Sequence, residues 1–163
     1  MTPVEQLSSL ELCAGAGGQA LGVEWAGFRH AGAVEIDSWA IETLRQNRPS
    51  WNPICGDVRD IRGRDYKGID LLAGGVPCPP FSVAGRQLGA DDHRDLFPAA
   101  LEWIRESKPR AVMLENVPGL ASSRFVDYRR NLFRSLHRMG FSFVDGRVLN
   151  ASDFGVQIGR AHV

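Results

Sequence analysis

Short apolar segments typical of strands alternate along this chain with segments of helical spacing, and this alternation restricts the fold more than any other feature. Such an order is typical of a mostly parallel sheet with helices on both faces. We therefore predict an α/β fold built on a doubly wound sheet. The expected strands are Leu7–Cys13, Ala31–Ile36, Ile54–Val58, Asp70–Ala73, Ala111–Leu114 and Phe141–Val148. The expected helices are Gln19–Ala26, a helix capped by Ser38 that runs through Asn47, Leu96–Ser107 and Phe125–Met139.

Composition places the chain among ordinary globular proteins. Its 163 residues fit about one domain, and 44% apolar with 23% charged residues argue against disorder. Three cysteines without a C-x-x-C spacing argue against a disulfide scaffold and a cysteine zinc site. No apolar run has membrane-spanning length and no secretion signal is present, so we expect a soluble cytoplasmic protein without a membrane partner. Equal numbers of basic and acidic residues, 19 each, argue against a nucleic-acid binder that is basic along its whole length.

Unusual residue clusters follow the first five expected strands. In parallel sheets ligands bind at the carboxyl ends of the strands, so these clusters predict one site at that edge. In chain order the clusters are Gly15 with Gly17 and Gly18, then Glu35, Asp57, the stretch Gly75–Ser82, and Glu115 with Asn116.

The first two clusters together indicate a cofactor that contains a nucleoside. Glycines between a strand and a helix let a ligand approach the backbone, and an acid about 20 residues later can accept both hydroxyls of a ribose. The spacing is G-x-G-G rather than G-x-G-x-x-G, so a pyrophosphate is not indicated. An ordinary tight turn beside a surface glutamate is the alternative interpretation.

Two further residues are candidates for chemistry. Cys78 stands among three prolines in a stiff loop, where a thiol is a candidate nucleophile, although a buried inert cysteine is the alternative. Glu115 follows an apolar strand, and emergence from a buried edge would raise its pKa as a proton donor requires. A structural glutamate bonded to loop amides is the alternative. We expect Cys13 and Cys55 in the core, and the four histidines have no metal-binding spacing.

Taken in order, these clusters resemble the motifs of the cytosine-5 DNA methyltransferase family. The first six motifs of that family match in order and spacing, over roughly residues 8–157. The matching segments are Glu11–Gly18, Glu35–Asp37, Gly56–Val58, Gly75–Ser82, Asp92–Phe97 and Glu115–Val117.

The resemblance implies a Rossmann-like fold, S-adenosylmethionine as methyl donor, and a covalent mechanism. Cys78 would attack C6 of a cytosine flipped from the DNA helix, while Glu115 would bond the ring N3 and the exocyclic amine. C5 would then take the methyl group, and loss of the C5 proton would expel Cys78. The sulfonium is already an activated donor, so no metal is implied.

The resemblance also assigns the binding residues. Glu35 would hold the ribose hydroxyls and Asp57 the adenine amine, with Ile36 and Val58 packed on the adenine. The full set expected at the cofactor is Cys13, Ala14, Gly15, Gly17, Gly18, Glu35, Ile36, Asp57, Val58, Pro77 and Leu96. The set expected at the target base is Pro77, Ser82, Arg94 and Asn116.

The resemblance stops after Val156, where the family continues with an arginine-containing motif and a target-recognition domain. Residues 158–163 read Ile-Gly-Arg-Ala-His-Val, which one frame of a common sequencing adapter encodes. We therefore expect residues 1–157 to be a partial catalytic domain of a prokaryotic or phage enzyme, and residues 158–163 to be non-native. Double-stranded DNA would be held by the absent recognition domain, so the fragment itself is expected to be inactive. A monomer is expected, and a restriction endonuclease would be the partner activity.

Three other functions compete with this interpretation. A tRNA cytosine-5 methyltransferase of the same family would differ mainly in the recognition region. A non-catalytic nucleoside- or nucleic-acid-binding module with this fold would have no reason to keep both Cys78 and Glu115. A dinucleotide-dependent oxidoreductase is disfavoured by the G-x-G-G spacing and by Cys78.

In a full-length enzyme that contains this segment, Cys78→Ser is expected to abolish methyl transfer, because a hydroxyl is a far weaker nucleophile than a thiolate. Binding of S-adenosylmethionine should stay within a few-fold of normal, since Glu35, Asp57 and the glycines are unchanged. Transfer of a labelled methyl group and calorimetric titration of the cofactor measure the two effects separately. Retained turnover would remove Cys78 from the nucleophile role.

Overall fold

The structure is a computed structural model that describes residues 6–77 and 95–156. The residues 158–163 that the sequence predicts to be non-native lie outside this part. The chain divides after Val117 into two compact units, each described on its own below. No helix in the described part is long and apolar enough to cross a membrane.

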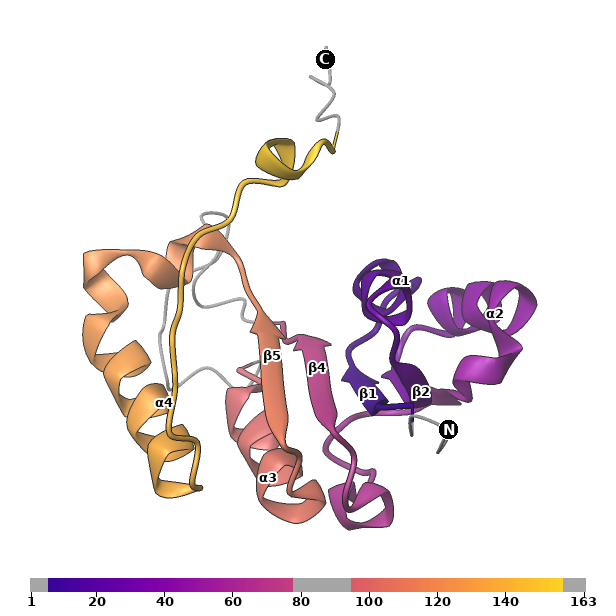
Figure 1. The fold of residues 1–163 in the computed structure, drawn as a ribbon, viewed down its shortest axis with the longest axis horizontal. Coiled ribbons are helices and arrows are strands. Elements are labelled where there is room, and N and C mark those ends of the chain that lie inside the picture. Colours follow the sequence, from indigo (N-terminus) through magenta and orange to yellow (C-terminus); the bar gives the residue numbers. More distant parts are fainter. Residues whose placement is uncertain (1–5, 78–94, 157–163) are drawn as a thin grey trace, which may run out of the picture. The chain divides into compact units, whose positions relative to one another are not determined.

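The first unit contains a five-stranded parallel sheet in the order β3-β2-β1-β4-β5 (Figure 1). The chain therefore runs outward from β1 through β2 to β3, then crosses back to β4 beside β1. Ligands in such sheets bind where the strand order reverses, which here is between β1 and β4. The strands are β1 Ser8–Leu12, β2 Arg29–Glu35, β3 Pro53–Cys55, β4 Leu71–Gly75 and β5 Ala111–Glu115.

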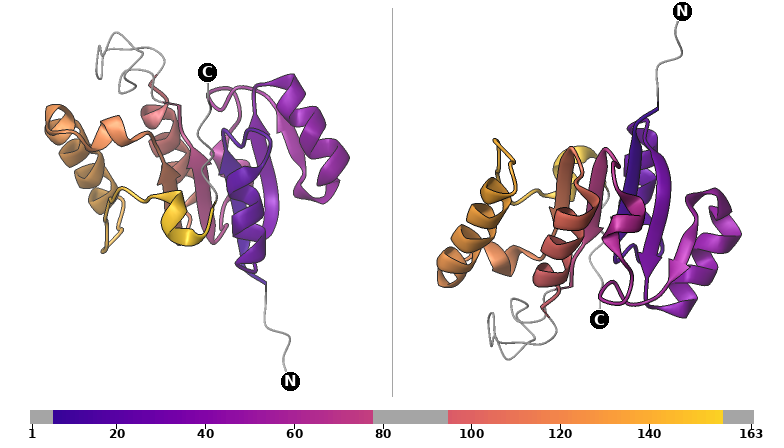
Figure 2. Two further views of the ribbon diagram at one scale, coloured as in Figure 1. Left: turned by 90° about the horizontal axis from the view of Figure 1, so that it is seen from above. Right: turned by 90° about the horizontal axis from the view of Figure 1, so that it is seen from below.

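Helices cover both faces of this sheet, so the predicted doubly wound α/β fold is confirmed. Helices α1 (Gly18–Trp25) and α2 (Ser38–Asn47) lie on one face. Helix α3 (Phe97–Ser107) and the short 3-10 turn η2 (Gly63–Tyr66) lie on the other, as the opposed views of Figure 2 show. The connections between β1, β2 and β3 carry the first pair of helices, and the crossings to β4 and β5 carry the second pair.

The core of this unit forms on both sides of β1. Towards α2, Ala20, Ile41, Leu44 and Trp51 are part of one buried cluster. On α3, the buried Trp103 donates its indole N–H to the backbone carbonyl of Val58 at 2.8 Å. This bond ties α3 to the loop after β3, so helix packing holds a segment at the carboxyl edge in place.

Two glycines are required where backbone segments approach closely. A Cβ on Gly74 of β4 would lie 2.7 Å from the carbonyl oxygen of Leu12 on β1, so no larger residue fits without moving a strand. Gly17 has φ of +93°, and a Cβ there would lie 2.8 Å from both Leu44 and Trp51. The two glycines therefore set how closely β1 meets β4 and how the first turn meets α2.

Three local predictions for this unit are wrong. The N-cap of α2 is Asp37 rather than Ser38, because the Asp37 carboxylate accepts the N–H groups of Trp39 and Ala40 at 2.8 and 3.0 Å. Strand β3 ends at Cys55 instead of Val58, because a turn begins at Asp57, whose carbonyl accepts the Asp60 N–H at 3.0 Å. Cys55 itself is exposed on this outermost strand of the sheet and is not a core residue.

The second unit is built on helix α4 (Val126–Arg138), preceded by the 3-10 turns η5 (Pro118–Ala121) and η6 (Ser123–Phe125) and followed by η7 (Ala151–Phe154). The strand predicted over Phe141–Val148 is absent from the described part, and its residues are irregular. The segment is held to α4 instead: the His137 ring lies 2.8 Å from the Phe141 carbonyl, and Gly146 packs against Phe133. Within the described residues this segment therefore forms no strand ladder.

Strand β1 buries a carboxyl group. The Glu11 side chain is 1% exposed, and its Oε2 has no hydrogen-bond partner among the described residues. Burial raises the pKa of Glu11 from 4.5 to about 7. Because the pKa of Glu11 is raised in the folded state, the contribution of the protonated Glu11 to the free energy of unfolding is fully present below about pH 4.5. This contribution is lost as the pH rises through about 7.

The substitution Glu11→Gln is therefore expected to stabilise the protein at pH 8, by roughly 1–3 kcal/mol, and to have little effect at pH 4.5. Urea unfolding between pH 4.5 and 8 measures the difference between the two proteins. Burial lowers the pKa of His30, so its contribution to the free energy of unfolding is lost as the pH falls. This contribution is the same in both proteins and cancels in the difference between them. Exposed Glu42, changed to Gln, is the control. A difference between wild type and Glu11→Gln that does not change with pH would contradict the assignment.

Candidate nucleotide-binding site

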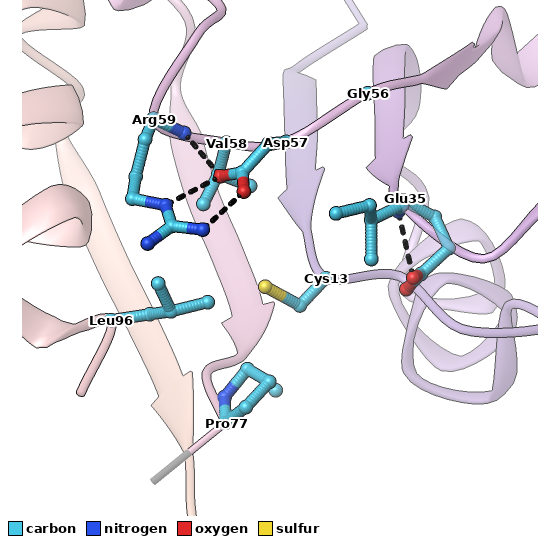
Figure 3. Close-up of a pocket in the computed structure, with 10 residues that line it drawn as sticks. Cys13, Glu35, Gly56, Asp57, Val58, Arg59, Pro77 and Leu96 are labelled. Atoms are coloured by element: carbon cyan, nitrogen blue, oxygen red, sulfur yellow. Dashed lines mark hydrogen bonds and ion pairs between the residues drawn. The ribbon is translucent and has the colours of Figure 1, made fainter. Parts of the chain in front are cut away.

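A cavity of about 450 Å³ opens at the carboxyl edge of the sheet (Figure 3). Its volume lies in the range of pockets that hold nucleoside-sized ligands. The residues that line it follow four different strands, as the sequence predicts for a site at this edge. They are Cys13 after β1, Glu35 and Ile36 at the end of β2, Gly56, Asp57, Val58 and Arg59 after β3, Gly75 and Pro77 at the end of β4, and Leu96 before α3.

Glu35 is the acid that the sequence predicts to follow the second strand, and its carboxylate joins the ends of β1 and β2. Oε2 accepts the Gly15 N–H at 2.8 Å, and Oε1 accepts the N–H groups of Ile36 and Asp37 at 2.8 and 2.9 Å. An ionised carboxylate has about four acceptor positions, so these bonds leave about one for a ligand hydroxyl. The side chain is fixed before any ligand arrives.

Asp57 lies across the cavity from Glu35 and is held by Arg59. The Arg59 backbone N–H and Nε both donate to Oδ1 at 2.9 Å, and Nη2 donates to Oδ2 at 2.5 Å. These hydrogen bonds to the Arg59 guanidinium lower the pKa of Asp57 below its ordinary value of 3.8. Asp57 is therefore an ionised acceptor at neutral pH. Arg59 is not among the site residues predicted from the sequence, although a basic side chain two residues after a carboxylate is a signal that could have found it.

Cys13 lines the cavity, as the resemblance predicts, and is partly buried there. Burial raises the pKa of its thiol to about 12, and the negative charges of Glu35 and Asp57 add to that shift. The thiol is thus neutral at physiological pH and unsuited to nucleophilic attack. Cys13 also has a left-handed backbone with φ of 53°, an uncommon conformation for a residue with a Cβ.

The rest of the first motif stands apart from the cavity wall. Ala14 and Gly17 are buried, and Gly17 packs against α2 and Trp51. Around Gly15 and Gly18 the positions of a missing Cβ face open space, so a ligand can approach the backbone there. The expected contacts of these four residues with a cofactor stay predictions.

Glu115 ends β5 next to the last residue of β4. Its Oε2 lies 3.5 Å from the position that a Cβ on Gly75 would occupy, and Gly75 lines the cavity. The side chain is exposed, so the prediction that Glu115 emerges from a buried edge is wrong. Side chains of β5 alternate between exposed and half-buried, and Glu115 stands on the exposed face of the strand in the described structure.

Asn116 fastens the end of β5 to the segment that follows β4. Its Nδ2 donates to the Val76 carbonyl at 2.7 Å, and its Oδ1 accepts the Val117 N–H at 2.9 Å. These bonds set the direction in which the chain leaves β4 towards Cys78. The expected contact of Asn116 with a target base stays a prediction.

Three predicted site residues, Cys78, Ser82 and Arg94, lie outside the described residues. Within residues 6–77 and 95–156, no group of three or more His, Cys, Asp or Glu side chains could hold a metal ion.

The chain is similar along most of its length to curated bacterial methyltransferases. It is 56% identical over 151 residues to the Type II methyltransferase M.NgoMIV of Neisseria gonorrhoeae, which covers 93% of this chain and 48% of that protein. It is 54% identical over 156 residues to the Type II methyltransferase M.NaeI of Lentzea aerocolonigenes, which covers 94% of this chain and 38% of that protein. The chain thus spans half or less of the length of these relatives.

Solved structures agree in fold. A protein described as a DNA modification methyltransferase encoded within an E. coli prophage superposes with a TM-score of 0.65 at 31% identity, over 81% of this chain and 38% of its own. The DNMT2 of Spodoptera frugiperda superposes with a TM-score of 0.63 at 23% identity, over 82% of this chain and 41% of its own, which shows a shared fold. The model of the C-5 cytosine-specific DNA methylase family matches residues 7–162. With its parallel sheet and the motif residues at the sheet's carboxyl edge, the chain belongs to the C-5 cytosine-specific DNA methylase family.

Proposed function

We propose that this chain is the cofactor-binding and catalytic part of a DNA cytosine-5 methyltransferase of the Type II restriction-modification class. One observation carries the proposal: Glu35 and Asp57 face one cavity at the sheet's carboxyl edge, in a chain 56% identical to a Type II methyltransferase. Glu115 stands at the same edge, beside Gly75.

The residues around the cavity fit the adenosine part of S-adenosylmethionine. Glu35 keeps about one acceptor position for a ribose hydroxyl, and Asp57 keeps one for the adenine amine. Ile36, Val58, Pro77 and Leu96 supply apolar lining for the adenine and its surroundings. When bound, S-adenosylmethionine supplies a methyl group already activated on a sulfonium.

The chemical roles fall to Cys78 and Glu115. The Cys78 thiolate bonds to C6 of cytosine, and the electron pair of the 5,6 double bond becomes available at C5. Glu115 bonds the ring N3 and exocyclic amine, and so stabilises the charge that develops on the ring. Once C5 carries the methyl group, loss of its proton restores the double bond and releases the thiolate. Glu115 stands beside Gly75 at the carboxyl edge, and Cys78 follows Gly75 by three residues in the sequence, which supports this pairing of roles.

The polynucleotide substrate is proposed to be double-stranded DNA rather than tRNA. Relatives more than 50% identical are Type II methyltransferases. Phosphate contacts supply much of the affinity of a DNA-binding protein, and this chain has no net charge. We therefore propose that the 163 residues alone do not methylate DNA.

Binding of S-adenosylmethionine by this chain is expected to weaken about tenfold or more in Glu35→Gln. The substitution removes the charge that strengthens the bond to a ribose hydroxyl, while it keeps the size of the side chain. Calorimetric titration of wild type and variant with S-adenosylmethionine measures the change.

Glu42→Gln on α2 is the matched control, because Glu42 is exposed and its side chain accepts a hydrogen bond from Gln46 on the same helix. Circular dichroism of both variants checks that the glycine turn still folds when one amide acceptor is changed. Equal affinity of Glu35→Gln and wild type would place the ribose elsewhere and count against the proposed cofactor site.

A further inference from the structure

The loop after β3 contains an ion pair that reaches into the cavity. Figure 3 shows the Arg59 guanidinium turned towards the Asp57 carboxylate, with both residues on the cavity wall. Three hydrogen bonds join them, two to Oδ1 and one to Oδ2. The Asp57 side chain is 16% exposed, whereas the Arg59 side chain is 56% exposed.

This ion pair contributes little to the stability of the fold. The two residues lie two positions apart in one turn, and one partner is mostly in solvent, where ion pairs are screened. The loop is already held from the other side by the bond between Trp103 and the Val58 carbonyl. The consequence of the pair is therefore local: it fixes the orientation of the Asp57 carboxylate.

A fixed carboxylate recognises a donor differently from a mobile one. Oδ1 has both of its acceptor positions filled by Arg59, and Oδ2 keeps one. A ligand that brings an N–H to Oδ2 pairs this acceptor without reorienting it, which saves entropy on binding. A ligand without that N–H leaves a desolvated acceptor unpaired, which disfavours binding.

Without the Arg59 side chain the carboxylate keeps only the bond from the backbone N–H of residue 59 to Oδ1, and Oδ2 can rotate towards water. A ligand lacking the donor would then leave no acceptor unpaired, and the difference between the two ligands would shrink. Among the described residues that line the cavity, the other titratable groups are Glu35 and the neutral thiol of Cys13, and neither is a cation that could replace Arg59.

We propose that Arg59 is a positioning residue that makes the cavity selective for adenine over purines without a 6-amino group, by aiming Oδ2 of Asp57 at that amine. The inference rests on the proposed function, since it takes the adenosine end of S-adenosylmethionine as the occupant. It adds a residue outside the matched motifs, and it assigns that residue to selectivity rather than to affinity in general.

The test compares two ligands that differ only at the 6-position: S-adenosylhomocysteine and its 6-deamino purine analogue. Calorimetric titration of each into the wild-type chain should show a preference of about fivefold to tenfold for the adenine form, the size of one hydrogen bond. Arg59→Ala should reduce the preference to about twofold or less, mainly by weakening the adenine form. Arg59→Lys should restore part of it, because a lysine pairs with the carboxylate but cannot hold it with two parallel bonds.

Arg62→Ala is the matched control, because Arg62 is an exposed arginine three residues further on that does not line the cavity. It should keep the wild-type preference. The melting temperature of each variant is measured alongside and should be nearly unchanged.

The outcomes separate the two proposals. A wild-type chain that binds neither ligand at millimolar concentration would contradict the proposed function itself. A wild-type preference that persists in Arg59→Ala would overturn the role of Arg59 while leaving the proposed function intact. Equal weakening of both ligands in Arg59→Ala would also overturn it, since that result describes general affinity. Arg59→Gln repeats the measurement if the alanine variant does not fold.

Discussion

The close approach of β1 and β4 is the constraint on which the site depends. At Gly74 a Cβ would lie 2.7 Å from the Leu12 carbonyl, so glycine alone lets the two strands pair at their carboxyl ends. The strand order reverses between these two strands, and their chains leave the edge in opposite directions. The cavity opens there, lined by the residues that follow each strand.

Two carboxylates give the cavity its character, and both are held by donors from their own surroundings. Glu35 is held by three backbone N–H groups, and Asp57 by the backbone and guanidinium of Arg59. Each keeps about one acceptor position directed to a ligand. Acceptors that are fixed before binding lose little conformational entropy when a ligand donor reaches them. A site of this kind can therefore be more selective than one with the same carboxylates in mobile positions. The neutral thiol of Cys13 between them adds wall surface without a third negative charge.

The sequence predicts the fold and the edge that carries the site, because periodicity, glycine turns and strand ends are local signals. It fails where a partner far along the chain decides the outcome. The segment Phe141–Val148 is predicted as a strand, but in the described structure it is irregular and is held to α4 through the Phe141 carbonyl and His137. Cys55 has an apolar neighbourhood in sequence and yet lies on the outermost strand, where it is exposed.

Side-chain pairing within loops is the other limit of sequence reasoning. Asp37 and Ser38 are both good capping residues, and only the backbone geometry shows that the aspartate takes the N–H groups. The role of Arg59 is not predicted from the sequence, because an arginine in a loop is usually a solvated charge. Its contact with Asp57 depends on the turn that follows β3. The exposure of Glu115 depends in the same way on which face of β5 it stands on, and in the described structure that face is the exposed one.

The central claim, that the carboxyl edge of this sheet binds an adenosine through Glu35 and Asp57, is tested most directly by a crystal structure of the chain with S-adenosylhomocysteine. The account predicts a ribose hydroxyl on Glu35, the adenine between Ile36 and Val58, and the 6-amino group on Oδ2 of Asp57. An adenine bound away from the loop after β3, or a ribose without contact to Glu35, would contradict it.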